Sequence, residues 1–289
     1  MDQPRKVEKP APLLPFLFES WPDSKKKQVR EWLKHGMVLV NGHIMRQFDH
    51  ALRPGDAVAI RQNRHAPADT FITGGIKIRY EDAELLVIEK PADLLSIASE
   101  GEQTKTAYFL LTDYLRNENP KSRERIWVVH RLDRETSGLM VFAKTAQAKT
   151  ALQQHWDEYE KRYLAVAEGK LKADKGKFDS YLDEANPYKV FVVPRSETAR
   201  RAITHYTVMK KGRGVVLVEL RLETGRRHQI RVQLADAGCP VVGDVKYGAK
   251  TDPAKRLALH SCALRFQHPV TGKEMAFQSP LPKELARLV

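Results

Sequence analysis

Near the middle of the chain, residues 130–139 read H-R-L-D-R-E-T-S-G-L, a polar turn between the apolar segments Ile126–Val129 and Leu139–Ala143. Short apolar runs bounded by turn residues predict buried strands, so we expect this turn to join two strands of a core sheet. The turn holds Asp133 between two arginines, which favours an anionic carboxylate. Taken alone, the segment is also compatible with an Asp/Ser/Gly turn whose charges face solvent.

Two further segments concentrate side chains suited to acid–base chemistry. Residues 161–166 read K-R-Y-L-A-V and place Tyr163 among aliphatic residues on a predicted strand, where core packing of the ring is the alternative. Residues 222–232 read L-E-T-G-R-R-H-Q-I-R-V, a glycine turn leading into a predicted helix. Arginines at a helix N-terminus oppose the helix dipole, so we expect an RNA phosphate or a buried carboxylate there, with a solvent-facing basic turn as the alternative.

Apolar periodicity over the rest of the large C-terminal part predicts more strands than helices, and many strands follow one another directly. That order favours an α+β fold on a mixed, mainly antiparallel sheet. The predicted strands cover residues 76–80, 85–89, 126–129, 139–143, 161–167, 204–209, 215–222 and 275–278. The predicted helices cover residues 106–116, 146–159 and 228–237.

A small basic unit precedes this part. Lys25–His35 has helical apolar spacing, and Asn41-Gly42 is a preferred two-residue hairpin turn. Nine Lys and Arg stand against three Asp and Glu between residues 24 and 64. We therefore predict a small basic α/β domain over residues 13–64, a linker over 65–75 and the large domain over 76–289, with residues 1–12 loose.

Composition indicates the class of partner. The chain has 289 residues and a net charge of +13, which suits a polyanion such as nucleic acid better than a neutral metabolite. We expect neither a membrane segment nor a signal peptide, and therefore a cytoplasmic protein. The two cysteines, Cys239 and Cys262, are predicted to be buried thiols.

The sequence lacks several familiar catalytic signatures. It contains no G-x-x-x-x-G-K-[ST], no helix-opening G-x-G-x-x-G, no H-E-x-x-H and no P-C-x-x-C. Nucleotide hydrolysis, dinucleotide redox chemistry, zinc proteolysis and zinc-dependent deamination therefore lose their usual motifs. We expect chemistry without a metal or cofactor, carried by carboxylate, Arg, Tyr and His side chains.

Taken together, the three segments resemble the signature blocks of the RluA-like pseudouridine synthases. Further matching blocks are E-K-P-A at 89–92, G-C-P-V-V-G-D-V-K-Y-G at 238–248, and L-H-S-C-A-L at 259–264 leading to His268-Pro269. The resemblance covers residues 76–283. The basic unit is similar to the small RNA-binding domain, named after a ribosomal protein, that is often fused to such enzymes.

The resemblance implies a fold, a reaction and a set of site residues. Members isomerise uridine to pseudouridine in structured RNA: the N-glycosidic bond breaks, the uracil turns, and carbon 5 is joined to the ribose. Asp133 matches the catalytic aspartate, Tyr163 the tyrosine that stacks on the flipped base, and Arg231 the arginine that pairs with the aspartate. The substrate-binding positions are Arg131, which matches the arginine entering the RNA stack, Ile230, Arg226 and His130.

Substrate and alternatives remain open from sequence. Ribosomal RNA of the 23S type is the leading expectation and tRNA the second, and we expect a monomer. After Ala92 the chain departs from the common family pattern over Asp93–Ser99, so the loop beside the site should differ. One alternative is a non-catalytic RNA-binding or ribosome-assembly protein on the same fold. Another is a hydrolase that cleaves the glycosidic bond without rejoining it, with Glu135 as a second carboxylate.

Overall fold

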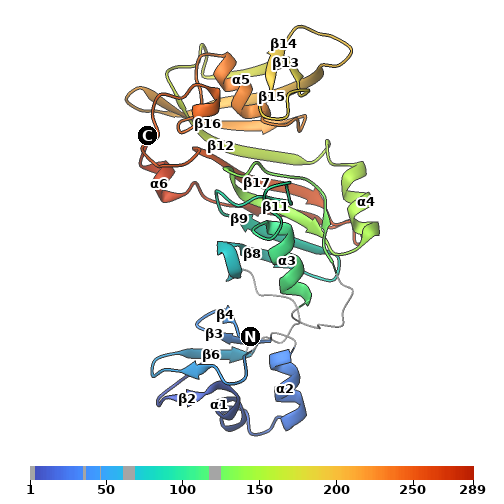
Figure 1. The fold of residues 1–289 in the computed structure, drawn as a ribbon, viewed down its shortest axis with the longest axis vertical. Helices are drawn as coiled ribbons and strands as arrows, with labels where there is room; N and C mark the ends of the chain where they lie inside the picture. Colours follow the sequence, from blue (N-terminus) through green and yellow to red (C-terminus); the bar gives the residue numbers. More distant parts are fainter. Residues whose placement is uncertain (1–3, 35–36, 46, 61–68, 117–124) are drawn as a thin grey trace. The chain divides into compact units, whose positions relative to one another are not determined.

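The computed structural model describes residues 4–34, 37–45, 47–60, 69–116 and 125–289 (Figure 1). The chain divides into two compact units. The first comprises Met1–Ile88, Ile97–Val128 and Val141–Lys149, and the second comprises Glu89–Ser96, Val129–Met140 and Thr150–Val289. None of the helices in the described segments is long and apolar enough to cross a membrane.

The N-terminal part of the first unit is a small α/β module. Its elements are β1 (Arg5–Lys6), β2 (Ala11–Pro12), α1 (Leu13–Ser20), α2 (Lys26–Lys34), β3 (Val38–Val40), β4 (His43–Ile44), β5 (Ala51–Leu52) and β6 (Ala57–Ile60). Four strands form an antiparallel sheet in the order β1-β6-β3-β4, and β2 pairs with β5. Asn41 and Gly42 adopt positive φ values of 52° and 81° between β3 and β4, which confirms the predicted hairpin turn.

Two boundaries differ from the sequence expectation. Residues 1–12 were expected to be loose, and this is wrong for β1 and for Val7, whose side chain is 2% exposed in the module's core. A strand pairing and one apolar side chain suffice to order a segment without visible periodicity. The end of the predicted helix at His35 and positions 65–68 of the predicted linker lie outside the described residues. The described part of that linker contains β7 (Thr70–Phe71), which pairs with β8, and a 3₁₀ turn, η1 (Thr73–Gly75).

The rest of the first unit contains part of a larger sheet. Its strands follow the order β11-β9-β8-β7, with β10 paired to β11. The elements are β8 (Lys77–Glu81), β9 (Leu85–Lys90), α3 (Ala107–Arg116), β10 (Trp127–Val128), β11 (Ser137–Ala143) and α4 (Ala146–Gln154). Strands β9 and β11, and helix α4, have residues in both units. Helix α4 ends at Gln154, short of the predicted Tyr159, because residues 155–158 form turns instead.

The second unit is built on strands in the order β14-β13-β15-β16-β12-β17-β11, with β18 paired to β17. Its elements are β12 (Glu160–Glu168), β13 (Lys175–Asp183), β14 (Phe191–Val193), β15 (Arg200–Lys211), β16 (Val215–Leu222), α5 (Gln229–Asp236), η2 (Val245–Tyr247), β17 (Leu259–Gln267), β18 (Glu274–Gln278) and α6 (Lys283–Ala286). The pair β11–β17 is parallel, and the other pairs described here are antiparallel. The predicted α+β class with a mainly antiparallel sheet is confirmed.

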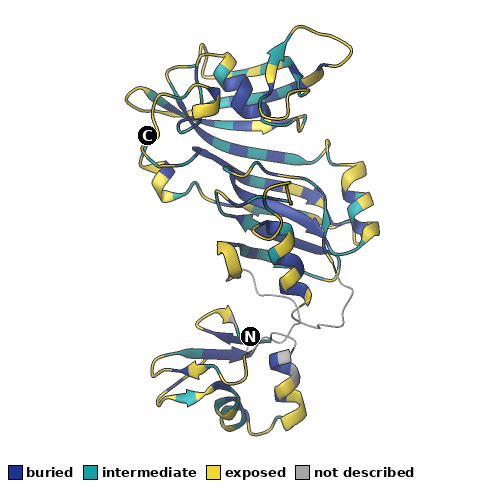
Figure 2. Ribbon diagram, viewed as in Figure 1, coloured by how far each residue is buried: buried dark blue, intermediate teal, exposed yellow. Residues whose placement is uncertain are grey.

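Strand β11 lies deepest in this arrangement. Each of its positions is buried (Figure 2), as expected for a strand covered on both faces. Gly138 near its start faces Ser261 of β17 across the parallel pair, with φ of 115°. A Cβ at Gly138 would lie 2.2 Å from the Ser261 carbonyl oxygen, so glycine is required for this approach. The polar turn 130–136 therefore ends at a closely fixed point of the sheet.

Both cysteines, Cys239 and Cys262, are free and buried, as predicted.

Candidate active site

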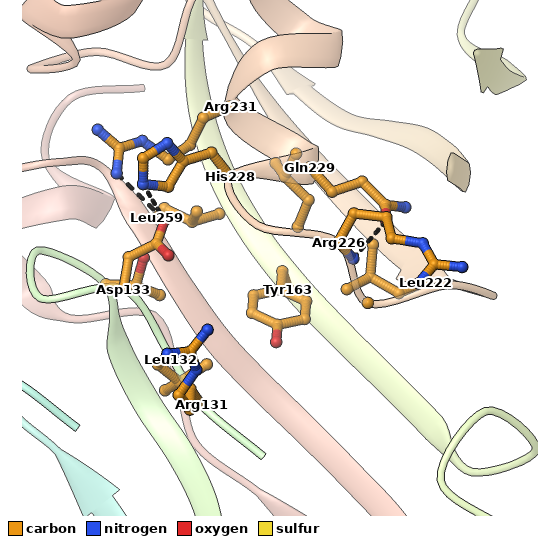
Figure 3. Close-up of a pocket in the computed structure, with 13 residues that line it drawn as sticks. Arg131, Leu132, Asp133, Tyr163, Leu222, Arg226, His228, Gln229, Arg231 and Leu259 are labelled. Carbon is orange, nitrogen blue, oxygen red and sulfur yellow. Dashed lines mark hydrogen bonds and ion pairs between the residues drawn. The ribbon is translucent and has the colours of Figure 1, made fainter. Parts of the chain in front are cut away.

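The three segments singled out in the sequence meet at one pocket within the second unit (Figure 3). Its walls come from the turn before β11, from β12 and β17, from the end of β16, and from the turn that opens α5. The lining residues are Arg131, Leu132, Asp133, Thr136, Tyr163, Leu222, Gly225, Arg226, His228, Gln229, Ile230, Arg231 and Leu259. Charged groups thus share the pocket with a phenol ring and aliphatic side chains, a lining that suits a flat, polar ring.

Asp133 and Arg231 form the charged centre of the pocket. Arg231 Nη1 donates a hydrogen bond of 3.1 Å to Asp133 Oδ2, although 98 residues separate the two positions. The Asp133 side chain is 24% exposed, so it faces the open side of the pocket, whereas the Arg231 side chain is 3% exposed. The buried guanidinium donates to the partly open carboxylate and fixes its direction.

Arg231 is itself held from behind by Asp244. Its Nε and Nη2 donate to the two carboxylate oxygens of Asp244 at 2.7 and 2.8 Å, a bidentate pair in which the Asp244 side chain is 1% exposed. Arg231 Nη1 also lies 3.3 Å from Glu135 Oε2. Burial opposes the charge of Arg231, but the hydrogen bonds and charge of Asp244 raise its pKa above the usual value. The anion expected near the start of α5 is therefore a buried carboxylate.

Tyr163 enters the pocket from β12. The pairing of β12 with β17 shifts register between Arg162 and Tyr163, and such a bulge redirects the side chain that follows it. The residue is 9% exposed. Burial raises the pKa of Tyr163, the charge of Asp133 raises it further, and the hydrogen bond with Ser261 only partly opposes this. The side chain is thus a protonated phenol at neutral pH.

His228 stands between the charged centre and a second tyrosine. Its backbone is left-handed, with φ of 53°, at the residue before α5. Nδ1 lies 2.8 Å from the hydroxyl of Tyr247, and Nε2 lies 4.0 Å from Asp133 Oδ2. Burial lowers the pKa of His228, with Arg231 acting in the same sense and Asp133 against it, so a neutral imidazole faces the carboxylate.

The turn that carries Asp133 is braced by the loop after β9. Lys90 is fully buried, and its Nζ donates to the carbonyl oxygens of Pro91, Leu94 and Arg134 at 2.9, 2.7 and 3.0 Å. Ser96 Oγ donates to the Leu132 carbonyl at 2.6 Å and accepts from its amide at 3.1 Å. These bonds fix the backbone on both sides of Asp133.

Six of the seven predicted site residues line the pocket: Arg131, Asp133, Tyr163, Arg226, Ile230 and Arg231. The seventh, His130, does not. Its ring stacks on Trp156 at a centroid distance of 4.3 Å, and burial lowers its pKa to about 3. The contact between His130 and substrate stays a prediction, since the residue lies outside the pocket lining and Trp156 covers one face of its ring.

Lys90, Asp244 and Tyr247 lie in segments that match the family blocks, but the sequence motifs alone indicate no role for them. What could have drawn attention to these three residues is a charged or polar side chain within a mostly apolar segment. Among the residues that the structure describes, no group of three His, Cys, Asp or Glu side chains is placed to hold a metal ion.

The comparison with family models identifies the class. Residues 84–236 match the model described as RNA pseudouridylate synthase. The chain therefore belongs to this family, as the RluA-like motif blocks predicted, and it is an isomerase that acts on RNA.

Within the family, the chain is similar to ribosomal large subunit pseudouridine synthase D of Xanthomonas campestris pv. campestris, with 36% identity over 94% of this chain and 86% of that protein. It is also similar to the protein of the same name from Escherichia coli K12, with 34% identity over 94% and 88%. Among solved structures, human RNA pseudouridylate synthase domain containing 4 matches with 27% identity and a TM-score of 0.60, over 73% of this chain and 92% of that chain.

Proposed function

We propose that Asp133 carries the isomerisation of a uridine in this pocket. The observation that supports this proposal is the ion pair between Asp133 and the buried Arg231, at an opening shared with Tyr163. An ionised carboxylate either attacks C1′ of the ribose or removes a ribose proton during cleavage. The N1–C1′ bond breaks, the C5–C1′ bond forms, C5 loses its proton to solvent, and N1 gains one. Atoms and electrons balance without a redox partner.

The other pocket residues serve binding and orientation in this proposal. Tyr163 stacks on the uracil as a neutral phenol, since its raised pKa opposes a role as phenolate. Ile230 supports the opposite edge of the ring, and Arg226 binds RNA at the rim. The exposed Arg131 fills the space that the flipped uridine leaves in the RNA stack. Flipping a base costs a few kcal/mol, which these stacking contacts offset.

We further propose 23S ribosomal RNA as the substrate, with tRNA second. The support is that similar proteins carry the name ribosomal large subunit pseudouridine synthase D. We propose a monomer that acts in the cytoplasm. Pseudouridine mapping of total RNA with and without this gene tests the substrate. Loss of sites confined to 23S RNA is the expected result, whereas loss confined to tRNA would contradict it.

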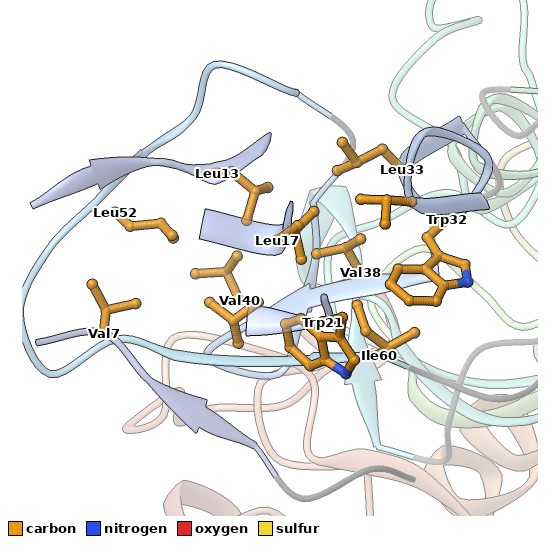
Figure 4. Close-up of a cluster of buried hydrophobic side chains, with 12 residues drawn as sticks. Val7, Leu13, Leu17, Trp21, Trp32, Leu33, Val38, Val40, Leu52 and Ile60 are labelled. Carbon is orange, nitrogen blue, oxygen red and sulfur yellow. The ribbon is translucent and has the colours of Figure 1, made fainter. Parts of the chain in front are cut away.

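The N-terminal module is proposed to be an RNA-binding domain, with boundaries close to 13–64 and followed by a linker near 65–75. Its support is a hydrophobic core built from its own residues (Figure 4). Leu13 and Leu17 of α1 pack there with Val38 and Val40 of β3. On α2, Lys26 and Lys27 are exposed, so the module presents positive charge that phosphate attracts.

The test of Asp133 uses an isosteric change and a matched control. Asp133→Asn removes the charge, and Glu135→Gln removes the neighbouring carboxylate that also contacts Arg231. With RNA tritiated at uracil C5, Asp133→Asn should release no tritium and Glu135→Gln should remain active. RNA binding should stay within about tenfold for both, because one non-anchoring contact is worth about 1.4 kcal/mol or less. Turnover by Asp133→Asn would overturn the assignment, and release of free uracil by the wild type would favour the hydrolase.

A further inference from the structure

An exposed tyrosine stands on a loop tied to the rim of the pocket. The loop spans residues 184–190 between β13 and β14, and Tyr188 is 79% exposed. A single exposed aromatic ring does not by itself indicate a binding site, since folded proteins expose much apolar surface. The backbone on both sides of this ring, however, is held by side-chain hydrogen bonds.

Arg227 fixes the first half of the loop. Its guanidinium donates to the carbonyl oxygens of Glu184 and Pro187 at 3.1 and 2.5 Å, and to that of Asn186. Its backbone amide donates to a Glu184 carboxylate oxygen at 2.7 Å. The Arg227 guanidinium, a group that could bind phosphate, thus holds three loop carbonyls instead. The immediate neighbours of Arg227 in sequence both line the pocket.

The second half is fixed on either side of Tyr188. Asn186 Oδ1 accepts hydrogen bonds from the amides of Tyr188 and Lys189 at 2.8 and 3.1 Å. The amide of Val190 donates to the Tyr247 hydroxyl at 2.9 Å, and that hydroxyl lies 2.8 Å from His228. The ring of Tyr188 is therefore presented to solvent from a backbone anchored at both ends to residues beside the charged centre.

The surroundings select the kind of partner. Arg226 on the rim is exposed, and its Nε donates only a 3.3 Å bond to the Arg201 carbonyl. Lys189 Nζ lies 5.8 Å from the ring centre of Phe191 and 5.4 Å from that of Tyr247. Positive charge interleaved with aromatic rings matches a nucleic acid strand, whose phosphates pair with the cations and whose unpaired bases stack on the rings.

We propose that Tyr188 stacks on an unpaired base of the substrate RNA, and that this base is close to the target uridine in the RNA sequence. This inference rests on the proposed function. It adds a binding subsite outside the pocket, which recognises a flat base on the rim and leaves the reacting uridine to Asp133 and Tyr163. Stacking is tolerant of base identity, so Tyr188 adds affinity for loops and bulges over paired RNA.

The test compares two substitutions of Tyr188 on a stem-loop substrate with unpaired bases beside the target. Tyr188→Phe keeps the ring, and Tyr188→Leu keeps apolar bulk without it. Base stacking is lost only in Tyr188→Leu, so RNA affinity should fall about 5–150-fold there and stay within about twofold in Tyr188→Phe. Phe109→Leu on α3, at an exposed phenylalanine of the first unit, is the matched control and should bind as the wild type does.

Two further measurements distinguish a failure of the Tyr188 proposal from a failure of the proposed reaction at Asp133. The single-turnover rate at saturating RNA should change less than twofold in Tyr188→Leu, because the reacting groups are intact. In RNA carrying 2-aminopurine beside the target, fluorescence quenching on binding should weaken in Tyr188→Leu. Equal affinity and equal quenching in Tyr188→Leu and the wild type would overturn the Tyr188 proposal. Absence of turnover by the wild type would instead count against the proposed function.

Discussion

Replacing Asp244 by Asn tests whether the site depends on a carboxylate that never reaches the pocket. Asp244 holds Nε and Nη2 of Arg231, which leaves Nη1 directed at Asp133. Asparagine keeps the shape and one acceptor oxygen but loses the charge and the second acceptor. The guanidinium of Arg231 then stays buried with fewer partners, and its direction toward Asp133 is no longer fixed.

The magnitude follows from the burial of both partners. Breaking a buried ion pair by removing one charge costs about 3–5 kcal/mol. Arg231 keeps Asp133 and Glu135 at 3.1 and 3.3 Å, so the lower end applies. At about 2–4 °C per kcal/mol for a chain of this size, the melting temperature should fall by roughly 6–12 °C. Misorientation of Arg231 should slow the single-turnover reaction by up to about 100-fold.

A second bidentate pair in the same unit supplies the control. Arg201 donates to both carboxylate oxygens of Asp179 at 2.8 and 2.7 Å, but its side chain is 54% exposed. Solvent screens such a pair, so Asp179→Asn should change neither the melting temperature nor turnover appreciably. Circular dichroism melts and single-turnover tritium release on both variants give the comparison. If Asp244→Asn melts and reacts as Asp179→Asn does, burial of the Arg231 pair does not control the site.

Three further expectations follow from the fold. Burial lowers the pKa of Lys90 from 10.5 to about 7. Between these two pH values the unfolded chain binds a proton that the folded chain lacks, so the stability of the wild type relative to Lys90→Met should rise from pH 7 toward pH 10. A difference in melting temperature that does not change with pH would contradict this. Gly138→Ala places a Cβ 2.2 Å from the Ser261 carbonyl oxygen and should strongly destabilise the protein, as thermal melting would show. Replacing Lys26 and Lys27 by Glu reverses two charges on α2. If each lysine contacts one phosphate, the slope of log affinity against log salt should become shallower by about 1.4–1.8. An unchanged slope would show that α2 does not contact the RNA.

The sequence supports much of this arrangement because several signals are local. The Asn41-Gly42 turn follows from the left-handed conformation that these two residues tolerate. Most strands of the core follow from apolar runs. Strand β13 was not predicted because its burial alternates only between exposed and half-buried along most of its length, so the sequence shows no clear apolar period. Its order comes from pairing with β14 and β15.

Most residues that line the pocket could be predicted from the sequence, but their geometry could not. The motif blocks led to Asp133, Tyr163 and Arg231, but local sequence carries no sign of how they meet. The direction of Tyr163 depends on a bulge between two strands, and the partner of Arg231 is Asp244, which lies past the end of α5. The stacking of His130 on Trp156 could not be predicted, because adjacency to Arg131 in sequence does not show where the ring packs.

Strand β17 has a consequence for when activity arises during synthesis. It lies between β11 and β12, and its Ser261 is opposite Gly138 on one side and Tyr163 on the other. The turn with Asp133 and the strand with Tyr163 are therefore joined by a segment that is synthesised after both of them. A nascent chain that ends before Leu259 holds both residues without the strand that aligns them. We therefore expect catalysis only after synthesis has passed β17, so that Asp133 and Tyr163 are made before they are aligned.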